Sequence, residues 1–190
     1  MTIQRIGLLL ACLVAAALLS GCAGSATPTP VQSEPAAAVR CLFAGTGATL
    51  AFDGKRLNFT CQQEGESEIG LLGDIVLADV GWTIEKATIG HSDAGFSLLS
   101  SEMVLVEYVE LSDGTLCAFA GTGATLAFEG KRLNFTCGSP EVGLLGDVML
   151  ADKGWVIEKG VIEHGESGFR LVSSEQVPIV ALSVVPVTGG

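Results

Sequence analysis

Apolar and polar residues alternate along the segment from Lys55 to Cys61. Leu57, Phe59 and Cys61 fall on one side of an extended backbone, and the polar residues between them fall on the other. A period of two is what a half-buried β-strand requires. We therefore expect a strand here, with these three side chains packed on one face.

A hairpin turn is expected directly before this strand. Asp53-Gly54 separates it from the apolar segment 48–52, and Asp-Gly is favoured in two-residue hairpin turns because both positions tolerate positive φ. The register that this turn sets places two pairs of residues opposite each other: Leu50 with Leu57, and Ala48 with Phe59.

Further apolar stretches bounded by glycine and polar residues predict more strands, while a helical period is almost absent. They lie around Cys41 and Phe43 and at 71–78, 82–89, 96–99 and 103–111. Short strands at this spacing are typical of an antiparallel sandwich or a small barrel.

The whole pattern occurs twice, and the agreement between the copies decreases along each copy. Cys41–Cys61 recurs as Cys117–Cys137 with 19 of 21 positions identical, Gly70–Gly90 recurs as Gly143–Glu163 with 14 of 21, and His91–Glu107 recurs as His164–Val180 with 8 of 17. We place the first β repeat at 39–113 and the second at 114–190.

No linker separates the two repeats. Leu111 and Leu116 are joined through Ser112-Asp113-Gly114-Thr115, which predicts a hairpin between the last strand of one repeat and the first strand of the next. A segment of about 70 residues buries little surface when it folds alone. We therefore expect the two repeats to pack as one cooperative unit.

Four cysteines lie in the repeats, one pair in each, at the same spacing. Four cysteines allow three pairings, and the repetition favours Cys41 with Cys61 and Cys117 with Cys137. The alternative is metal ligation, but no Cys-x-x-Cys or Cys/His spacing supports a metal site. The predicted fold is therefore all-β, with two tandem disulfide-stapled antiparallel repeats packed as a sandwich or small barrel.

The N-terminal segment predicts export. Ile6–Leu19 is apolar, too short to span a membrane and of the length of a signal-peptide core. It ends in Leu19-Ser20-Gly21-Cys22, which resembles the lipobox of bacterial lipoproteins. The resemblance implies a signal peptide at 1–21 and a diacylglyceryl group on Cys22. The alternatives are an ordinary cleaved signal or an uncleaved anchor, and both also take the chain out of the cytoplasm.

Residues 22–38, rich in proline and alanine, are expected to form a disordered tether. The net charge of −11 is dispersed along the chain, which argues against a nucleic-acid partner and leaves membrane attachment to the lipid anchor. No nucleophile–base arrangement or cofactor motif is present. We expect no catalysis, no cofactor and no resident metal.

Two kinds of side chain are candidates for partner binding. Lys55-Arg56 and Lys131-Arg132 are the only paired basic residues in the repeats; they could bind a partner's carboxylates or keep a strand edge soluble. Trp82 and Trp155 would stack on sugar rings if exposed, although core packing is the favoured interpretation because tryptophan buries a large apolar area.

Several histidine and acidic residues also recur, with weaker implications. His91-Ser-Asp93 and His164-Gly-Glu166 supply too few ligands for a metal, and a polar turn is the simpler interpretation. Four aspartates suggest calcium only weakly, and turn capping is the simpler role for them: Asp74, Asp79, Asp147 and Asp152.

The sequence therefore predicts a non-catalytic lipoprotein of the cell envelope or surface that binds a protein or glycan through its repeats. The alternative is an inhibitor of a secreted hydrolase, since the disulfide-stapled β architecture and the Phe-Thr-Cys ending at 59–61 are broadly similar to lysozyme-inhibitor lipoproteins. A binder should expose apolar side chains at equivalent places on both repeats, whereas an inhibitor should present one protruding loop.

Overall fold

The computed structural model describes residues 38–61, 67–152 and 154–187. The predicted signal peptide, the lipid site at Cys22 and nearly all of the tether lie outside these residues. All the described residues belong to one compact unit. In the described part of the chain, no helix has the length and hydropathy to cross a membrane.

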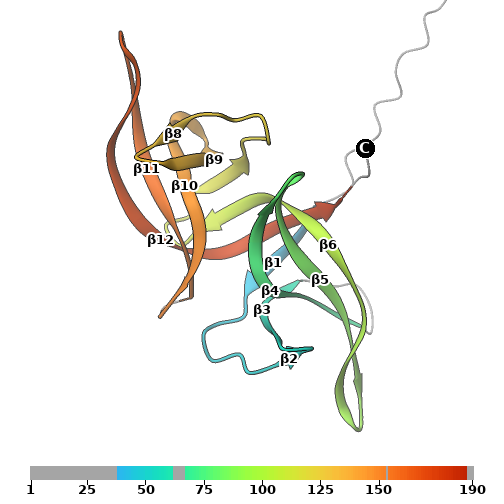
Figure 1. The fold of residues 1–190 in the computed structure, drawn as a ribbon. Helices are drawn as coiled ribbons and strands as arrows, with labels where there is room; N and C mark the ends of the chain where they lie inside the picture. The colour runs from blue at the N-terminus through green and yellow to red at the C-terminus, as the bar shows by residue number, and fades with distance from the viewer. Residues whose placement is uncertain (1–37, 62–66, 153, 188–190) are drawn as a thin grey trace, which may run out of the picture. The chain divides into compact units, whose positions relative to one another are not determined.

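The described residues form an all-β, antiparallel fold, as the sequence predicts (Figure 1). The first repeat contains β1 (Val39–Phe43), β2 (Ala51–Phe52), β3 (Lys55–Cys61), β4 (Glu68–Ala78), β5 (Gly81–Ser92) and β6 (Gly95–Leu111). The second contains β7 (Leu116–Phe119), β8 (Ala127–Phe128), β9 (Lys131–Cys137), β10 (Ser139–Ala151), β11 (Gly154–Gly165) and β12 (Gly168–Pro186).

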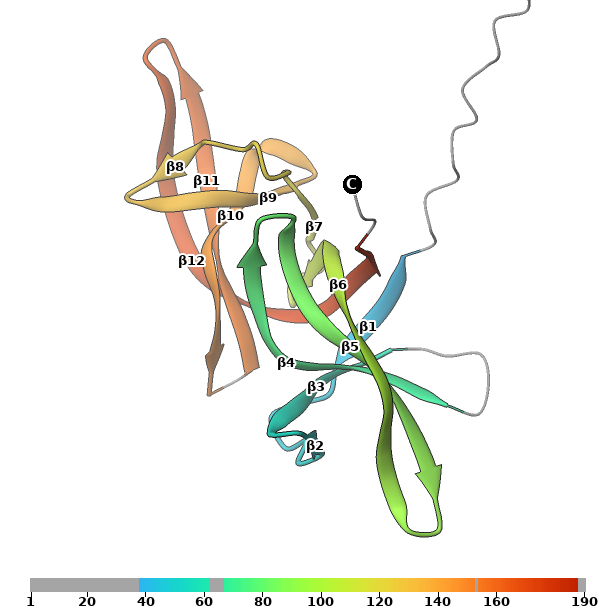
Figure 2. The same cartoon turned by 45° about the vertical axis from the view of Figure 1, so that its right-hand side comes forward.

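Strand β6 is continuous, which corrects the prediction of two separate strands at 96–99 and 103–111. The polar residues 100–102 between them pair with residues 86–88 of β5, so the ladder does not break. Residues 95–103 of β6 are exposed or half-buried and lie outside the core. Polar side chains are tolerated in such a strand, so the polar residues 100–102 do not mark a break. In Figures 1 and 2 the β5–β6 and β11–β12 hairpins each extend away from the other strands of their repeat.

The hairpin turn at Asp53-Gly54 forms as predicted, with φ of 49° and 78°. The backbone amide of Leu57 donates to the carbonyl oxygen of Leu50 at 2.9 Å, which confirms that pair. The second predicted pair is wrong, because Phe59 lies opposite Phe43 of β1 rather than opposite Ala48. Strand β1 pairs with residues 59–61 of β3 along this edge. Only Ala51–Phe52 is left to pair with the start of β3, and these two residues form β2.

The expectation that Leu57, Phe59 and Cys61 share one face is also wrong. The β3–β4 register shifts between Leu57 and Phe59, so a β-bulge at Asn58 interrupts the alternation. Phe59 and Cys61 pack in the main core, whereas Leu57 packs in a smaller cluster on the other side.

Each repeat closes its sheet with strands from the other repeat. Strand β1 pairs with β3 of its own repeat and with β12 of the second, while β7 pairs with β9 and with β6 of the first. Strands β6 and β12 pair with each other. Two closed circuits result, β1-β3-β4-β5-β6-β12 and β7-β9-β10-β11-β12-β6, which share the β6–β12 pair.

The register of β6 with β12 has local two-fold symmetry. Val109, opposite Leu182, marks its centre, because these two residues occupy equivalent positions in the repeats. On either side, Leu111 opposite Ile179 is matched by Val184 opposite Val106. The disulfide strands follow the same rule: Cys41 lies opposite Leu182, and Cys117 lies opposite Val109. The repeats therefore relate to each other like the subunits of a strand-exchanged dimer.

The main core is shared by both repeats, and each repeat adds one small cluster of its own. The disulfides Cys41–Cys61 and Cys117–Cys137 both form, as predicted, and all four cysteines are buried in the shared core. Trp82 of the first repeat packs against Phe135 of the second, with ring centroids 6.4 Å apart. The hairpin predicted between Leu111 and Leu116 also forms, as the β6–β7 pair.

Candidate functional site: two matched pockets

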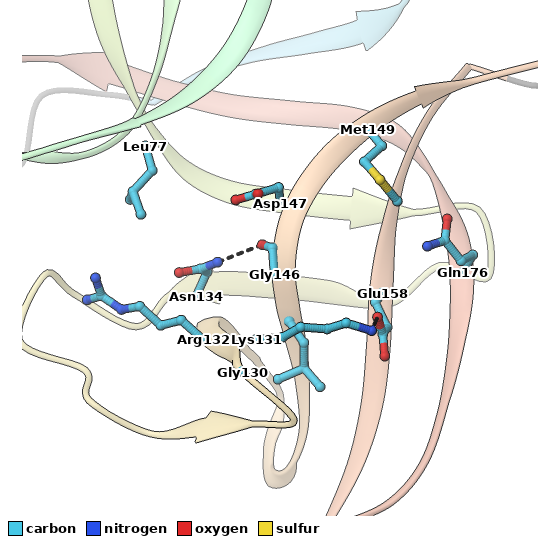
Figure 3. Close-up of a pocket in the computed structure, with 11 residues that line it drawn as sticks. Leu77, Gly130, Lys131, Arg132, Asn134, Gly146, Asp147, Met149, Glu158 and Gln176 are labelled. Atoms are coloured by element: carbon cyan, nitrogen blue, oxygen red, sulfur yellow. Dashed lines mark hydrogen bonds and ion pairs between the residues drawn. The ribbon is translucent and has the colours of Figure 1, made fainter.

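Two surface pockets of nearly equal size, about 370 and 380 Å³, lie at equivalent places on the two repeats. The repeat 1 pocket is lined by Gly54, Lys55, Arg56, Asn58, Leu72, Gly73, Asp74, Val76, Glu85, Met103, Leu150 and Trp155. The repeat 2 pocket is lined by Leu77, Gly130, Lys131, Arg132, Asn134, Leu145, Gly146, Asp147, Met149, Glu158 and Gln176 (Figure 3).

Five polar positions carry identical residues in the two pockets. Lysine, arginine, asparagine, aspartate and glutamate stand at 55, 56, 58, 74 and 85 in the first repeat and at 131, 132, 134, 147 and 158 in the second. Each pocket also receives one leucine from the other repeat: Leu77 enters the repeat 2 pocket and Leu150 the repeat 1 pocket. Each pocket is therefore completed by the exchange of strands between the repeats.

A second irregularity in the sheet shapes each pocket. The β4–β5 register shifts between Leu72 and Val76, and Gly73 adopts a φ of 69° there, a conformation that favours glycine. The Asn58 side-chain amide donates to the Gly73 carbonyl oxygen at 2.6 Å, and Asn134 donates to Gly146 at 2.7 Å. Each buried asparagine thus donates a hydrogen bond to a carbonyl oxygen of the distorted strand. This role explains why a polar residue interrupts the apolar pattern at this position.

An ion pair spans the side of each pocket, Lys55 with Glu85 and Lys131 with Glu158. The hydrogen bond from the Lys55 ammonium lowers the pKa of Glu85 below its usual value, and Ser101 lowers it further. The hydrogen bond from Lys131 lowers the pKa of Glu158 in the same way. Both lysines in turn have a raised pKa. All four groups are therefore charged near neutral pH.

Each arginine holds a loop of its own repeat, the one between β1 and β2 or the one between β7 and β8. Arg56 donates to the carbonyl oxygens of Gly45 and Thr46, and Arg132 donates to those of Gly121 and Thr122 at 3.2 and 2.5 Å. The structure thus brings the four predicted basic residues into the two pockets. Each of them is already engaged inside the protein.

The aspartates at 74 and 147 are exposed and line the pockets. We expected them to cap turns, but no described backbone amide donates a hydrogen bond to either carboxylate. Figure 3 shows the Asp147 carboxylate above Asn134 and to the right of Leu77. These carboxylates are therefore the acidic groups that the pockets offer to a ligand.

Trp82 and Trp155 are only 1% and 3% exposed. This burial removes them as exposed partner-binding residues, and core packing is the correct interpretation. Besides packing in the core, Trp155 forms part of the wall of the repeat 1 pocket.

The histidine motifs form the ends of the long hairpins. His91 stacks on Phe96 with ring centroids 4.8 Å apart, and His164 stacks on Phe169 at 4.7 Å. Within the described ranges, no group of three His, Cys, Asp or Glu side chains is arranged to hold a metal ion.

Large apolar side chains are exposed at equivalent places on both repeats. The matched pairs are Val76 and Met149, Leu77 and Leu150, Phe96 and Phe169, and Leu99 and Val172, with 44–60% of each residue exposed. Two of these pairs, Val76 with Met149 and Leu77 with Leu150, also line the pockets.

Sequence reasoning missed Glu85, Asn58 and Leu77 and their counterparts as pocket residues. The same residue stands at each of these positions in both repeats, and this repetition was a signal that the sequence offered. That the residues meet in one pocket depends on strand pairing, which the sequence pattern does not give.

Comparison of the chain with protein-family models, with curated proteins and with solved structures finds no match.

Proposed function

We propose that the chain is a lipid-anchored protein of the cell envelope or surface that binds a protein or glycan without catalysing a reaction. The observation that carries this proposal is the pair of matched pockets with the same five polar residues. Exposed apolar side chains at equivalent places on both repeats add support, because they are the feature expected of a binder.

Two equivalent pockets in one chain suit a repetitive partner. A ligand that occupies both gains from effective concentration, since the second binding event becomes intramolecular. This gain in affinity requires no catalytic residues. It requires that both pockets bind the same unit of the partner, which accounts for the same polar side chains in both.

Binding through the pockets is testable with extracts of the host envelope. The immobilised chain is incubated with untreated extract and with protease-treated extract, which retains glycans. The double variant Asp74→Asn/Asp147→Asn should lose most of the captured material, because it removes one acceptor charge from each pocket. Asp79→Asn/Asp152→Asn makes the same charge change at exposed positions outside the pockets and should bind normally. Equal capture by both double variants would contradict the proposal.

Anchoring is a separate part of the proposal and rests on Leu19-Ser20-Gly21-Cys22. Mass spectrometry of the N-terminus from the native host should find diacylglyceryl-modified Cys22. An unmodified, freely soluble N-terminus would contradict the lipid anchor while leaving the binding proposal in place.

A further inference from the structure

The charges inside each pocket balance, although the whole chain carries a net charge of −11. The repeat 2 pocket contains Lys131 and Arg132 against Asp147 and Glu158, and the repeat 1 pocket has the same four residue types. A site for phosphate or another anion would show an excess of cations, and a site for a basic side chain would show an excess of acids. The balance favours a ligand that is itself uncharged.

The polar groups of the repeat 2 pocket offer both acceptors and donors to such a ligand, and the repeat 1 pocket contains the same residue types. The Asp147 carboxylate accepts no hydrogen bond from the described residues, and the buried Asn134 Oδ1 atom has no hydrogen-bond partner. In Figure 3 this oxygen points away from Gly146, toward the side of the pocket where Arg132 lies. Lys131 holds Glu158 with one of its three donors. A hydroxyl group suits this mixture because it donates and accepts hydrogen bonds at once.

An apolar border completes each pocket. Leu77 and Met149 lie on either side of Asp147 in the upper part of the repeat 2 pocket in Figure 3, and they are 44% and 48% exposed. Leu150 and Val76 hold the equivalent positions in the repeat 1 pocket. A sugar ring has this dual character, with C–H faces for an apolar border and hydroxyl groups around its rim. Small-molecule sites commonly combine an apolar lining with a few polar groups.

We propose that each pocket binds one neutral, hydroxyl-rich sugar unit of a glycan, so that each chain carries two equivalent glycan sites. This inference rests on the proposed binding function and selects the glycan over the protein partner. Asp74 and Asp147 accept hydrogen bonds from sugar hydroxyls, and Leu150 and Leu77 contact the ring. Because Leu77 and Leu150 come from the opposite repeat, both sites exist only in the paired repeats.

The test uses the intact ¹⁵N-labelled chain and neutral tetrasaccharides of N-acetylglucosamine, glucose (β- and α-linked) and mannose. Charged probes of similar size are the glucosamine tetramer, which is cationic, and the galacturonate tetramer, which is anionic. The side-chain amide signals of Asn58 and Asn134 report the two pockets separately. At least one neutral probe should shift both signals, with an affinity that changes less than about twofold between 0.05 and 0.5 M salt, because a neutral ligand is little affected by screening.

Single-pocket variants locate the binding. Asp147→Asn should weaken binding about tenfold at Asn134 and leave Asn58 unchanged, since a hydrogen bond to a charged acceptor contributes about 1.5 kcal/mol. Asp74→Asn should do the reverse, and Asp79→Asn and Asp152→Asn should change neither. Tighter, salt-sensitive binding of a charged probe would overturn the neutral-glycan inference. So would the absence of any shift with every neutral probe.

The two proposals fail in different ways. If envelope material binds through the pockets but only a charged probe shifts the asparagine signals, the ligand class is wrong and the binding function stands. If capture from the extracts does not depend on the pockets, the binding function itself is wrong.

Discussion

The two repeats carry the same five polar residues in their pockets and differ where the chain crosses from one repeat to the other. Lys86 and Lys159 occupy equivalent positions, yet Lys86 pairs with Glu102 of its own hairpin, whereas Lys159 pairs with Asp113 in the connecting turn. The chain makes that turn once, so the local symmetry has to break there. The polar residues that form a pocket are therefore the same in both repeats, whereas residues next to the connecting turn have different partners in the two repeats.

A second difference lies on the exchanged strands. Arg40 on β1 pairs with Glu110 on β6, but the position equivalent to Arg40 on β7 is Leu116, which is 53% exposed. An exposed ion pair contributes little to stability. The exchange of strands therefore depends on the shared core, and substitutions in that core should affect both repeats alike.

The largest effects are expected where an aromatic ring of one repeat lies against a glycine of the other. A Cβ atom at Gly81 would lie 2.9 Å from the ring of Phe119, and one at Gly154 would lie 2.6 Å from the ring of Phe43. Both glycines also have positive φ, 129° and 113°. Gly81→Ala and Gly154→Ala should each lower the free energy of unfolding by about 4 kcal/mol in chemical denaturation, through backbone strain and overpacking together.

The matched controls are Gly95→Ala and Gly168→Ala. These glycines have φ of 110° and 108°, but a Cβ atom there would meet nothing within 4 Å. They should lose only the strain contribution, about 2 kcal/mol. Equal losses at all four positions would show that the contacts between repeats contribute nothing.

Removal of one disulfide should have the next largest effect. Replacing both cysteines of either pair by alanine should cost about 3 kcal/mol of unfolding free energy on the chain-entropy model, because each bridge closes a loop with a sequence separation of 20. Chemical denaturation should give the same loss for Cys41–Cys61 as for Cys117–Cys137. A clear inequality would mean that the repeats contribute unequally to the folded state.

The ion pairs of the pockets should have smaller effects, again equal in the two repeats. Lys55→Met and Lys131→Met should lower the free energy of unfolding only slightly, because an ion pair that is open to solvent contributes little to stability. A ¹³C titration of the carboxyl groups should show the pKa of Glu85 and Glu158 rising toward 4.5. Because the folded pKa is depressed, the stabilisation exists above the unfolded value and is lost as the pH falls through the folded value. An unchanged pKa in either variant would contradict the pairing.

The smallest effect is expected at the connecting turn. Hydrogen bonds from Lys159 and from Thr115 lower the pKa of Asp113 from 3.8 to about 2. Asp113→Asn should lower stability by about 0.3 kcal/mol at neutral pH, since the pair is exposed. The difference from wild type should persist above pH 3.8 and vanish as the pH falls to about 2. A difference that grew on acidification would contradict this assignment.

Local pattern was enough to predict the turns, most strand ends and the disulfides, because each depends on neighbouring residues or on repeated spacing. It failed at Asn58, where a polar residue marks a bulge and moves Leu57 to another face. Alternation reports that a strand has a buried face, not which strand lies beside it. The pairing of β1 with β12, which joins opposite ends of the folded chain, was therefore beyond it.

The candidate site divides in the same way. Paired basic charges pointed to Lys55-Arg56 and Lys131-Arg132, and both pairs line the pockets. Glu85 reaches the repeat 1 pocket from β5, and Leu150 reaches it from β10 of the other repeat. Only long-range pairing brings them there, and no local pattern encodes it.

The central claim is that the repeats complete each other, and native-state hydrogen exchange of the Gly81→Ala variant tests it most directly. The slowest amides of the first repeat, such as those of Leu71 and Ile84, are compared with those of Leu144 and Ile157 in the second. The account predicts the same loss of protection in both repeats, because strands that share one core and one β6–β12 pair open together. Loss confined to the first repeat, with wild-type protection in the second, would contradict it.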